Sequence, residues 1–587
     1  MRNNIEQIVS QAIAAAIEAG ELALDYTPEA ALERPRDPEH GDWACTIALK
    51  LAKELGRNPR EIAQVIAARI QTSELVSSVE VAGPGFINLR LSPAALQQVV
   101  REAWEQGPDF ARLNVGAGRT VNVEFISANP TGPMHVGHGR WAALGNAMCN
   151  VLEHAGWQVT REFYINDAGS QMDKFGRSIE IRYRQLQGED LPWPEDEGLY
   201  GGQYVIELAQ ELLAADGSGA SLPASSEFRE RGYQLMLGRM QALCERIGVP
   251  FHVWYSEREL YQPRADGHSA IETMLAELQR GGYLYEHEGA TWFRSTDFGD
   301  DKDRVLVKAD GDYTYFAPDI AYHLSKFGRG SEFLINIWGA DHHGYIPRMQ
   351  AACTALGHSG KLTIVLGQLV NLYRGGEAVR MSKRTGEMVT FEELIEEVGP
   401  DATKYLMLAR SSDQALDFDI EAATRQDASN PVYYVQYAHA RICSILRKAQ
   451  AGSADGAGVG TNDEPLDQPD ALASGGGVVP AVAGGISAAA MAQADLTLLT
   501  HPAELDLARE FARLAEVVEG AAADLAPFRL THYAEQLATA FHSFYTRCQV
   551  LTDAAALTAA RLYLVQATRN VLALTLSLIG VSAPERM

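Results

Sequence analysis

Two short motifs in this chain combine residue types that suit chemistry on a phosphate group. In the first, His135-Val-Gly-His138-Gly139, the two histidines are three residues apart and so lie on one side of a first helical turn. Imidazole N–H groups and a helix N-terminus both stabilise an anion, and Gly137 leaves room for a flat base against the backbone. The same pattern also fits two unrelated histidines or half of a metal site.

The second motif, Arg380-Met-Ser-Lys383-Arg384-Thr-Gly386, places three cations within five residues of an acidic chain. It lies between the pair Gly375-Gly376 and Gly386, so it is expected to be a flexible basic loop. Such a loop suits a triphosphate that moves during a reaction. Taken alone, such a motif is more often a solvated run of charge.

The elements around the first motif predict a parallel sheet. Val121, Val123 and Phe125 alternate with polar residues as in a strand, the turn 127–133 follows, 135–154 has the pattern of a helix, and 159–165 alternates again. This order is a βαβ unit. It returns as a strand at 333–338, a helix at 346–356 and a strand at 362–366, so residues 111–395 are expected to form a Rossmann-like catalytic domain. An inserted subdomain is predicted at about 170–330, with a mobile loop at 214–226.

Both flanks differ from this centre. Residues 1–110 combine helical patterns with strands at 79–81 and 86–91, which predicts a small α+β domain. After about residue 400 no strand is expected, and 396–587 is predicted to be an all-helical domain with a flexible insertion at 451–492, rich in Ala, Gly, Ser and Asp. The helices are expected at 402–408, 432–448, 505–518, 533–547 and 558–578.

Composition narrows the class of protein. The 587 residues carry a formal charge of −26, which argues against a wholly basic nucleic-acid-binding surface but leaves local patches open. Six widely spaced cysteines exclude a disulfide scaffold or a cysteine-ligated zinc ribbon. No signal peptide is apparent, and the apolar stretch 571–583 is too short for a membrane span. We therefore expect a cytoplasmic protein with no membrane association and no tightly bound metal.

Together, the two motifs resemble the HIGH and KMSKS motifs of class I aminoacyl-tRNA synthetases, one after the first strand of a βα sheet and one after its last. The resemblance sharpens to the arginyl-tRNA synthetases and covers nearly the whole chain except 451–492. It is carried by Ser127–His138, Met381–Gly386, Asn430–Ala440 and Ser582–Met587. Arg380 and Arg384 depart from the general class I loop, which has Lys and Ser there.

The resemblance implies adenylate formation from L-arginine and ATP with Mg²⁺, followed by transfer to tRNA(Arg), in an enzyme expected to be a monomer. In the family the first domain touches the tRNA corner and the helical domain binds the anticodon. The implied catalytic residues are His135, His138 and Lys383. The implied ATP-binding residues are Gly137, Gly139, Asp341, Arg380, Met381, Ser382 and Arg384. The implied arginine-binding residues are Glu124, Asn129, Tyr315, Asp319 and His343, and the implied tRNA-binding residues are Phe86, Asn88, Tyr545 and Met587.

Charge complementarity supports the arginine pocket, because only carboxylates accept the paired N–H donors of a guanidinium at full charge. Glu124 and Asp319 would supply them; otherwise Glu124 is a solvated strand residue and Asp319 a helix cap. Asp341, which follows the strand 333–338, suits an ATP ribose, but beside His342 and His343 it also suits zinc.

For tRNA, the alternatives are structural: Phe86 and Asn88 fit a core aromatic and a strand amide as well as a base contact. Tyr533, Phe541, Phe544 and Tyr545 fall at helical spacing, which more often marks a core stripe. Two other functions remain open. A small-molecule nucleotidyltransferase would share His-x-Gly-His but have no use for the helical domain, and a synthetase-like binding protein without catalysis would not need His135, His138 and Lys383.

Overall fold

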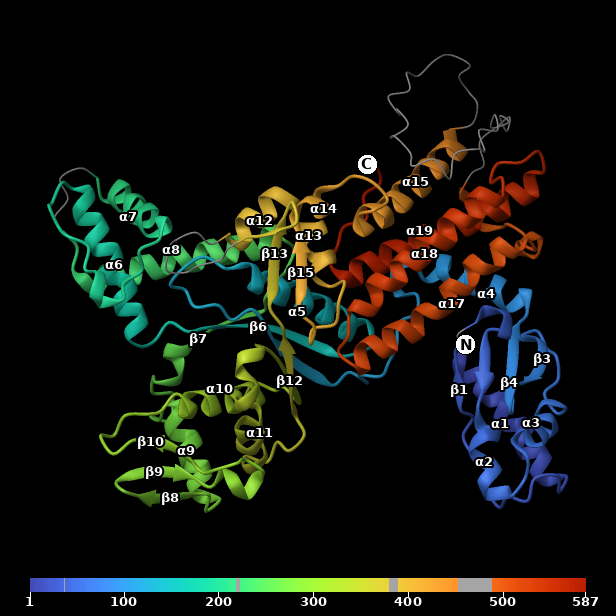
Figure 1. The fold of residues 1–587 in the computed structure, drawn as a ribbon, viewed down its shortest axis with the longest axis horizontal. Coiled ribbons are helices and arrows are strands. Elements are labelled where there is room, and N and C mark those ends of the chain that lie inside the picture. The colour runs from blue at the N-terminus through green and yellow to red at the C-terminus, as the bar shows by residue number, and fades with distance from the viewer. Residues whose placement is uncertain (36, 218–221, 380–388, 452–487) are drawn as a thin grey trace, which may run out of the picture.

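The computed structural model describes residues 1–35, 37–217, 222–379, 389–451 and 488–587. A parallel sheet lies at the centre of the molecule, and the remaining elements extend from it as separate lobes (Figure 1). In this view the lobe containing β8–β10 lies at the lower left, α6 and α7 lie at the upper left, and the N-terminal domain lies at the lower right, below the helical domain.

The N-terminal domain is an α+β unit, as the sequence predicted. Its antiparallel sheet has the order β1-β2-β4-β3, and the apolar face of the first helix, from Ile5 to Ala16, is buried. Asn58 caps the third helix with Pro59 at its first position. The elements are α1 (Arg2–Glu18), β1 (Leu32–Glu33), β2 (Trp43–Cys45), α2 (Ile47–Leu55), α3 (Pro59–Ala67), β3 (Val76–Ala82), β4 (Phe86–Leu91) and α4 (Pro93–Gln106).

The central sheet confirms the predicted Rossmann-like fold. Its five strands are all parallel, in the order β12-β11-β5-β6-β7. Its elements are β5 (Thr120–Glu124), α5 (Val136–His154), β6 (Gln158–Ile165), β7 (Val253–Ser256), β11 (Phe333–Gly339), α11 (Ile346–Ala355) and β12 (Leu362–Gly367). Register pairs Glu124 with Glu162 on one side and with Asn336 on the other. These three side chains therefore lie in one row on one face of the sheet.

The region predicted as one inserted subdomain, about 170–330, is two segments separated by β7 of the central sheet. The first contains α6 (Ser170–Leu186), α7 (Gln203–Asp216) and α8 (Ser225–Arg246). The second contains α9 (Ala270–Arg280), β8 (Leu284–His287), β9 (Ala290–Phe293), β10 (Arg304–Val307) and α10 (Phe316–Gly328). A short strand of four residues between helices gave no distinct signal in the sequence. Of the predicted loop at 214–226, residues 214–216 end α7 and residues 225–226 begin α8, while 218–221 lie outside the described residues.

The prediction that strands end by about residue 400 was wrong. β15 (Leu416–Asp419) pairs in parallel with β13 (Val370–Arg374), which also pairs with β14 (Glu377–Ala378). The sequence pattern did not reveal this strand because it contains only two buried apolar residues, Leu416 and Phe418. The same region contains α12 (Phe391–Val398), α13 (Pro400–Met407) and α14 (Ile420–Thr424).

The C-terminal domain is helical, with the predicted long helices in place. They are α15 (Pro431–Ala451), α17 (Pro502–Ala523), α18 (Phe528–Arg547) and α19 (Ala555–Ile579). By length and composition α19 could cross a membrane, but 72% of its apolar window is buried in the protein, as in a core helix. Most of the predicted insertion, residues 452–487, lies outside the described residues, and its described end forms α16 (Ala488–Ala492), whose Met491 is buried.

Candidate active site

The arm between β5 and α5 links two parts of the site through a strained turn. Ile126 and Ser127 have φ values of 68° and 46°, in the left-handed region that a β-branched residue rarely adopts. Ser127 Oγ holds this turn: it donates to Glu124 Oε1 at 3.0 Å and accepts from the Tyr164 backbone N–H at 3.2 Å. The end of β5 and the start of the arm are therefore fixed together.

The two motif histidines stack at the start of α5, with ring centroids 3.6 Å apart. The backbone N–H of His135 donates to His138 Nδ1 at 3.1 Å, which leaves the ring proton of neutral His138 on Nε2. The Trp141 ring supports both imidazoles edge-on, at 5.4 Å from His138 and 6.2 Å from His135. Gly139 has no room for a side chain, because a Cβ would lie 2.4 Å from the Phe391 ring. The arrangement pre-orients the imidazoles at a helix N-terminus.

The basic motif, residues Arg380, Met381, Ser382, Lys383 and Arg384, lies outside the described residues. The chain that follows it is anchored to the first motif, however. Thr390 forms a β-bridge with His135, and the Phe391 N–H donates to the Met134 carbonyl at 2.8 Å. Thr390 also caps α12 in a box with Glu393. The chain just after the second motif thus meets the first motif in space, although about 250 residues separate His135 from Thr390.

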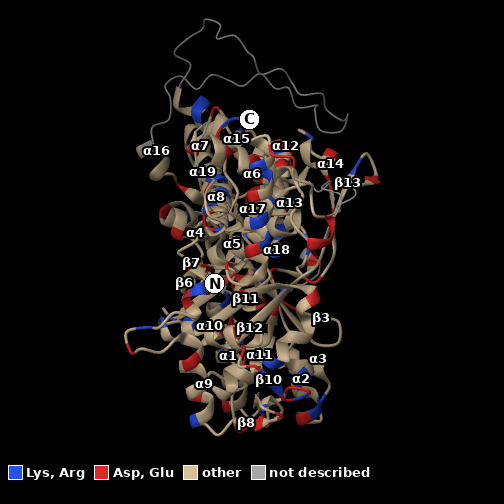
Figure 2. Cartoon of the chain, turned by 90° about the vertical axis from the view of Figure 1, so that its left-hand side faces the viewer, with Lys and Arg blue, Asp and Glu red and all other residues tan. Residues whose placement is uncertain are grey.

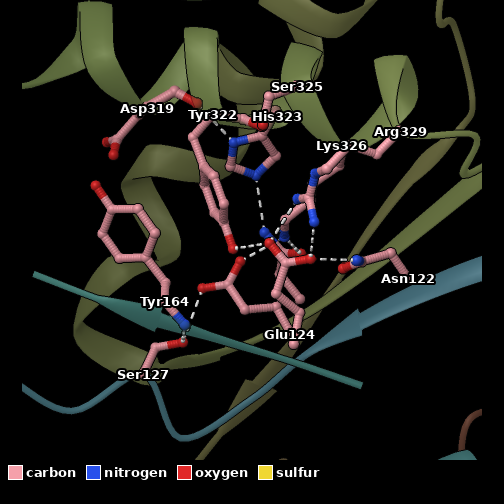
Figure 3. A network of polar contacts seen from close by, with 12 residues as sticks. Asn122, Glu124, Ser127, Tyr164, Asp319, Tyr322, His323, Ser325, Lys326 and Arg329 are labelled. Carbon is pink, nitrogen blue, oxygen red and sulfur yellow. Dashed lines mark hydrogen bonds and ion pairs between the residues drawn. The ribbon is translucent and has the colours of Figure 1, made fainter. Parts of the chain in front are cut away.

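A buried polar network lies between α10 and the sheet (Figure 3). Lys326, fully buried, donates to Glu124 Oε2 at 2.5 Å and to Asn336 Oδ1 at 3.0 Å. Asn336 Nδ2 in turn contacts His323 Nε2 at 2.8 Å, and His323 Nδ1 contacts the Asp319 carbonyl at 2.7 Å. Burial and the nearby Lys326 charge lower the pKa of His323 to about 4. His323 is therefore neutral at pH 7 and donates from Nδ1, since a carbonyl oxygen only accepts.

The Glu162 carboxylate, next along the same row, accepts four hydrogen bonds from three residues. Arg329 donates to both of its oxygens at 2.7 and 2.8 Å, Tyr322 donates its hydroxyl at 2.8 Å and Asn122 donates its amide at 2.6 Å. Burial opposes ionisation, but Arg329, Lys326 and the Asn122 hydrogen bond lower the pKa of Glu162 below its ordinary value. Glu162 is thus ionised and fully compensated.

Asp319 differs from both glutamates. Its carboxylate accepts from the Tyr345 hydroxyl at 2.6 Å, and no Lys or Arg lies within ion-pair distance of it in the part of the chain that the structure describes. Burial and the charges of Glu257 and Glu124 raise the pKa of Asp319 to about 7, against the Tyr345 hydrogen bond. Burial likewise raises the pKa of Glu257. The carboxylates of Asp319 and Glu257 therefore lie close together without a compensating cation among the described residues.

The other residues predicted for ATP and arginine lie at the carboxyl ends of the strands, where a parallel sheet binds ligands. Asp341 and His343 are exposed on the turn after β11, and the Asp341 carboxylate lies 3.7 Å from His342 Nε2. Asn129 is exposed on the arm and donates to Gln171 at 3.3 Å. Tyr315, at the start of α10, is 92% exposed. All are accessible to a ligand.

The residues predicted for tRNA are mixed. In β4, Phe86 is half-buried and Asn88 is 8% exposed. In α18, Tyr533, Phe541 and Phe544 are buried core residues, as the alternative held. Tyr545 is half-buried beneath Arg441, whose guanidinium carbon is 4.6 Å from the ring centroid, and Met587 is 55% exposed.

Sequence reasoning missed most of the buried network. Its missed members are Glu162, Glu257, Tyr322, His323, Lys326, Arg329, Asn336 and Tyr345. One signal was available: Asp319, Tyr322, His323 and Lys326 follow the spacing i, i+3, i+4, i+7. This spacing places them in a polar stripe on one face of α10.

Protein-family models match three parts of the chain. Residues 3–91 match the arginyl-tRNA synthetase N-terminal domain, 105–191 and 234–443 match the class I (R) tRNA synthetase catalytic domain, and 484–587 match the DALR anticodon-binding domain. The catalytic-domain match therefore extends past β15 into α15 and leaves out residues 192–233, which include α7.

Known proteins match over the full length. An arginine–tRNA ligase of Heliobacterium modesticaldum is 46% identical over all of this chain and 99% of its own, and one of Syntrophotalea carbinolica is 44% identical over all of both. Among solved structures, the Thermus thermophilus arginyl-tRNA synthetase shares the fold with a TM-score of 0.71 at 23% identity, covering all of both chains. These matches contradict both the nucleotidyltransferase and the non-catalytic alternative.

Proposed function

We propose a division of labour among the site residues of this chain, which belongs to the class I arginyl-tRNA synthetases and is an arginine–tRNA ligase. The enzyme activates arginine with ATP, forming arginyl-adenylate and pyrophosphate, and then transfers arginine to the terminal adenosine of tRNA(Arg). The observation that carries our proposal is the environment of Asp319. This half-buried carboxylate lies on α10, the helix that packs on the sheet, and it has no cationic partner among the described residues.

At the ATP end, His135 and His138 stabilise the negative charge that develops on the α-phosphate when the arginine carboxylate attacks in line. Their stacked geometry supports this, because His138 presents an Nε2 donor and both rings lie at a helix N-terminus. Neither histidine has to act as a base. Gly137, Gly139 and Asp341 contact the adenosine, and Arg380, Met381, Ser382, Lys383 and Arg384 receive the leaving pyrophosphate.

At the arginine end, Asp319 and Glu124 flank the guanidinium, with Tyr315 at the mouth of the pocket and Asn129 and His343 toward the α-amino and carboxylate groups. A carboxylate is the acceptor that suits a bidentate guanidinium. A lysine side chain, a point charge, would leave acceptors unpaired and would be discriminated against.

Mg²⁺ enters as part of the ATP complex. The protein acts as a cytoplasmic monomer. Phe86 and Asn88 meet the tRNA corner, Tyr545 and Met587 meet the anticodon region, and transfer goes to the 2′-hydroxyl. Local contacts suit this protein better than a basic face, because Lys and Arg are interspersed with Asp and Glu on the side seen in Figure 2.

ATP–pyrophosphate exchange measured with each of the twenty amino acids, with and without tRNA, tests the proposal. Exchange should occur with arginine alone among them and should need the cognate tRNA. Lys383→Ala should slow adenylate formation much more than the transfer of preformed arginyl-adenylate to tRNA. Equal slowing of both steps would refute the leaving-group role of the basic motif.

A further inference from the structure

Helix α10 presents a polar stripe to a polar row of the sheet. Asp319, Tyr322, His323 and Lys326 lie on its inner face, opposite the row of Asn336, Glu124 and Glu162 from three adjacent strands (Figure 3). Buried polar side chains at this density are stable only when each has its partners. The question is how their charges are distributed.

The Lys326 ammonium group forms two hydrogen bonds and one cation–π contact within the protein. It contacts Glu124 Oε2 and Asn336 Oδ1 and lies 4.4 Å from the Tyr322 ring centroid. Through Asn336 and His323 its contacts continue to the backbone carbonyl of Asp319. A buried ammonium group with such partners is a permanent part of the structure, not a side chain waiting for a ligand.

The second oxygen of Glu124 is also engaged. It accepts from Ser127, the residue that also bonds the Tyr164 N–H and has a positive φ. Lys326 therefore holds Glu124 in place, and Glu124 holds the strained turn at the start of the arm between β5 and α5. Removing the ammonium group would leave a buried carboxylate that protonates or turns away, and the turn would lose its partner.

The Asp319 carboxylate points away from this network, and no dashed contact reaches it among the residues drawn in Figure 3. The groups that face it are Glu124 from β5, Tyr164 from β6, Glu257 and Tyr261 from the segment after β7, and Tyr345 from the turn after β11. None is a cation.

We propose that Lys326 is a positioning residue of the arginine pocket. Its ammonium group permanently compensates Glu124 and holds it on Ser127, so that Asp319 is the carboxylate whose charge meets the substrate. Glu124 still offers the guanidinium an acceptor lone pair, but its charge is already balanced. This inference rests on the proposed arginine pocket and assigns unequal roles to its two carboxylates.

A rescue experiment tests the assignment: Lys326→Met, Glu124→Gln and the double variant, which removes both charges while nearly keeping both shapes. Arginine and ATP Michaelis constants are measured by pyrophosphate exchange with tRNA present. Each single variant should raise the arginine constant by about tenfold or more, with the ATP constant within about twofold, because each leaves one buried charge unpaired. The double variant should recover most of that loss.

Lys404→Met is the matched control. Lys404 is another buried lysine, on α13, and donates to the Ile247 carbonyl at 2.6 Å. Its loss should lower the melting temperature without changing the arginine constant. If Lys326→Met likewise lowers the melting temperature and leaves the arginine constant unchanged, Lys326 has only a structural role. A double variant as impaired as Glu124→Gln would show that the charge of Glu124 itself meets arginine. Either result overturns the inference.

A measurement on the unaltered enzyme covers the case in which the variants do not fold. Calorimetry of arginine binding to the tRNA complex at pH 6.5, in two buffers of different ionisation enthalpy, should show the release of about three-quarters of a proton from Asp319. No proton release would mean that Asp319 is already compensated and would also overturn the inference. The proposed pocket fails separately, if Asp319→Asn leaves the arginine constant unchanged.

Discussion

At the proposed arginine end of the active site, Glu124 and Glu162 are already paired with Lys326 and Arg329 within the protein. At the proposed ATP end, by contrast, the Asp341 side chain is 81% exposed. The first end is built by packing between α10 and three strands. The second draws on residues that are close together in the chain, at the start of α5 and in the turn after β11. The two ends therefore call for different kinds of variant.

This contrast has a mechanistic consequence. A preformed, desolvated pocket selects its ligand in the ground state, so its variants should change the Michaelis constant of arginine. Groups at the proposed ATP end stabilise charge that develops on the phosphates only during the reaction. Their variants should therefore change the rate constant of arginine activation. The predictions below test whether the two ends separate in this way.

The largest effect is expected at the ATP end. His138→Ala should lower the rate constant of arginine activation by about 10²-fold or more, while the ATP Michaelis constant changes much less. Single-turnover adenylate formation measures this. The control is His154→Ala, at the other end of α5, where His154 Nε2 bonds the Phe110 carbonyl at 3.0 Å and loss should affect stability alone. An equal loss in rate and ATP binding would break the comparison.

At the arginine end, Asp319→Asn keeps the shape and removes the charge. It should raise the arginine Michaelis constant by roughly tenfold to a hundredfold, about 1.4 to 3 kcal/mol, with the ATP constant little changed. Steady-state exchange at varied arginine measures it, with Asp301→Asn, an exposed carboxylate of the same lobe, as the control. A change within about twofold would place the pocket elsewhere. Citrulline, which is neutral, should not be activated by the wild type.

A smaller effect is expected from pH. Burial and neighbouring carboxylates raise the pKa of Asp319 to about 7, and in the proposed pocket arginine binds the ionised form. The protonated fraction grows as pH falls, so the arginine Michaelis constant should rise below pH 7 and level off above it. From pH 7.5 to pH 6 we expect roughly an eightfold rise. Asp319→Asn should remove this dependence, and a parallel change in the ATP constant would assign it to another group.

The same contrast explains what the sequence could predict. The Rossmann-like sheet, the N-terminal α+β domain and the long C-terminal helices follow from local periodicity, and the ATP end follows from residues adjacent in the chain. Glu124 and Asp319 were predicted as arginine-binding carboxylates from the family resemblance and from charge complementarity. Its compensating cations were not, because Lys326 and Arg329 become partners of Glu124 and Glu162 only when α10 packs on the sheet.

Two fold predictions failed for a related reason. β7 and β15 are strands of four residues whose pairing partners lie far away in the chain, so no local pattern distinguishes them from loops. Their placement matters for function, because β7 carries the chain to Glu257 and β15 supports β13, which precedes the basic motif.

The signature arm joins the two ends, and the smallest predicted effect tests to which of them it belongs. Tyr204, on α7, donates its hydroxyl to the Thr131 carbonyl at 2.8 Å, and a Cβ on Gly132 would lie 3.2 Å from that hydroxyl. This brace comes from residues 192–233, which the family's catalytic-domain model leaves out. Tyr204→Phe removes one hydrogen bond and keeps the ring, a loss of about 1 kcal/mol, or roughly fivefold.

Because the arm holds His135 at one end and Ser127 at the other, we expect the loss from Tyr204→Phe to fall on the activation rate, with both Michaelis constants within about twofold. Tyr200→Phe is the matched control, since Tyr200 packs edge-on against Phe175, with ring centroids 5.9 Å apart, and its hydroxyl has no hydrogen-bond partner among the described residues. If the arginine Michaelis constant rises instead, the arm between β5 and α5 belongs to the arginine pocket. The arginine end of the site would then extend from Ser127 to the start of α5.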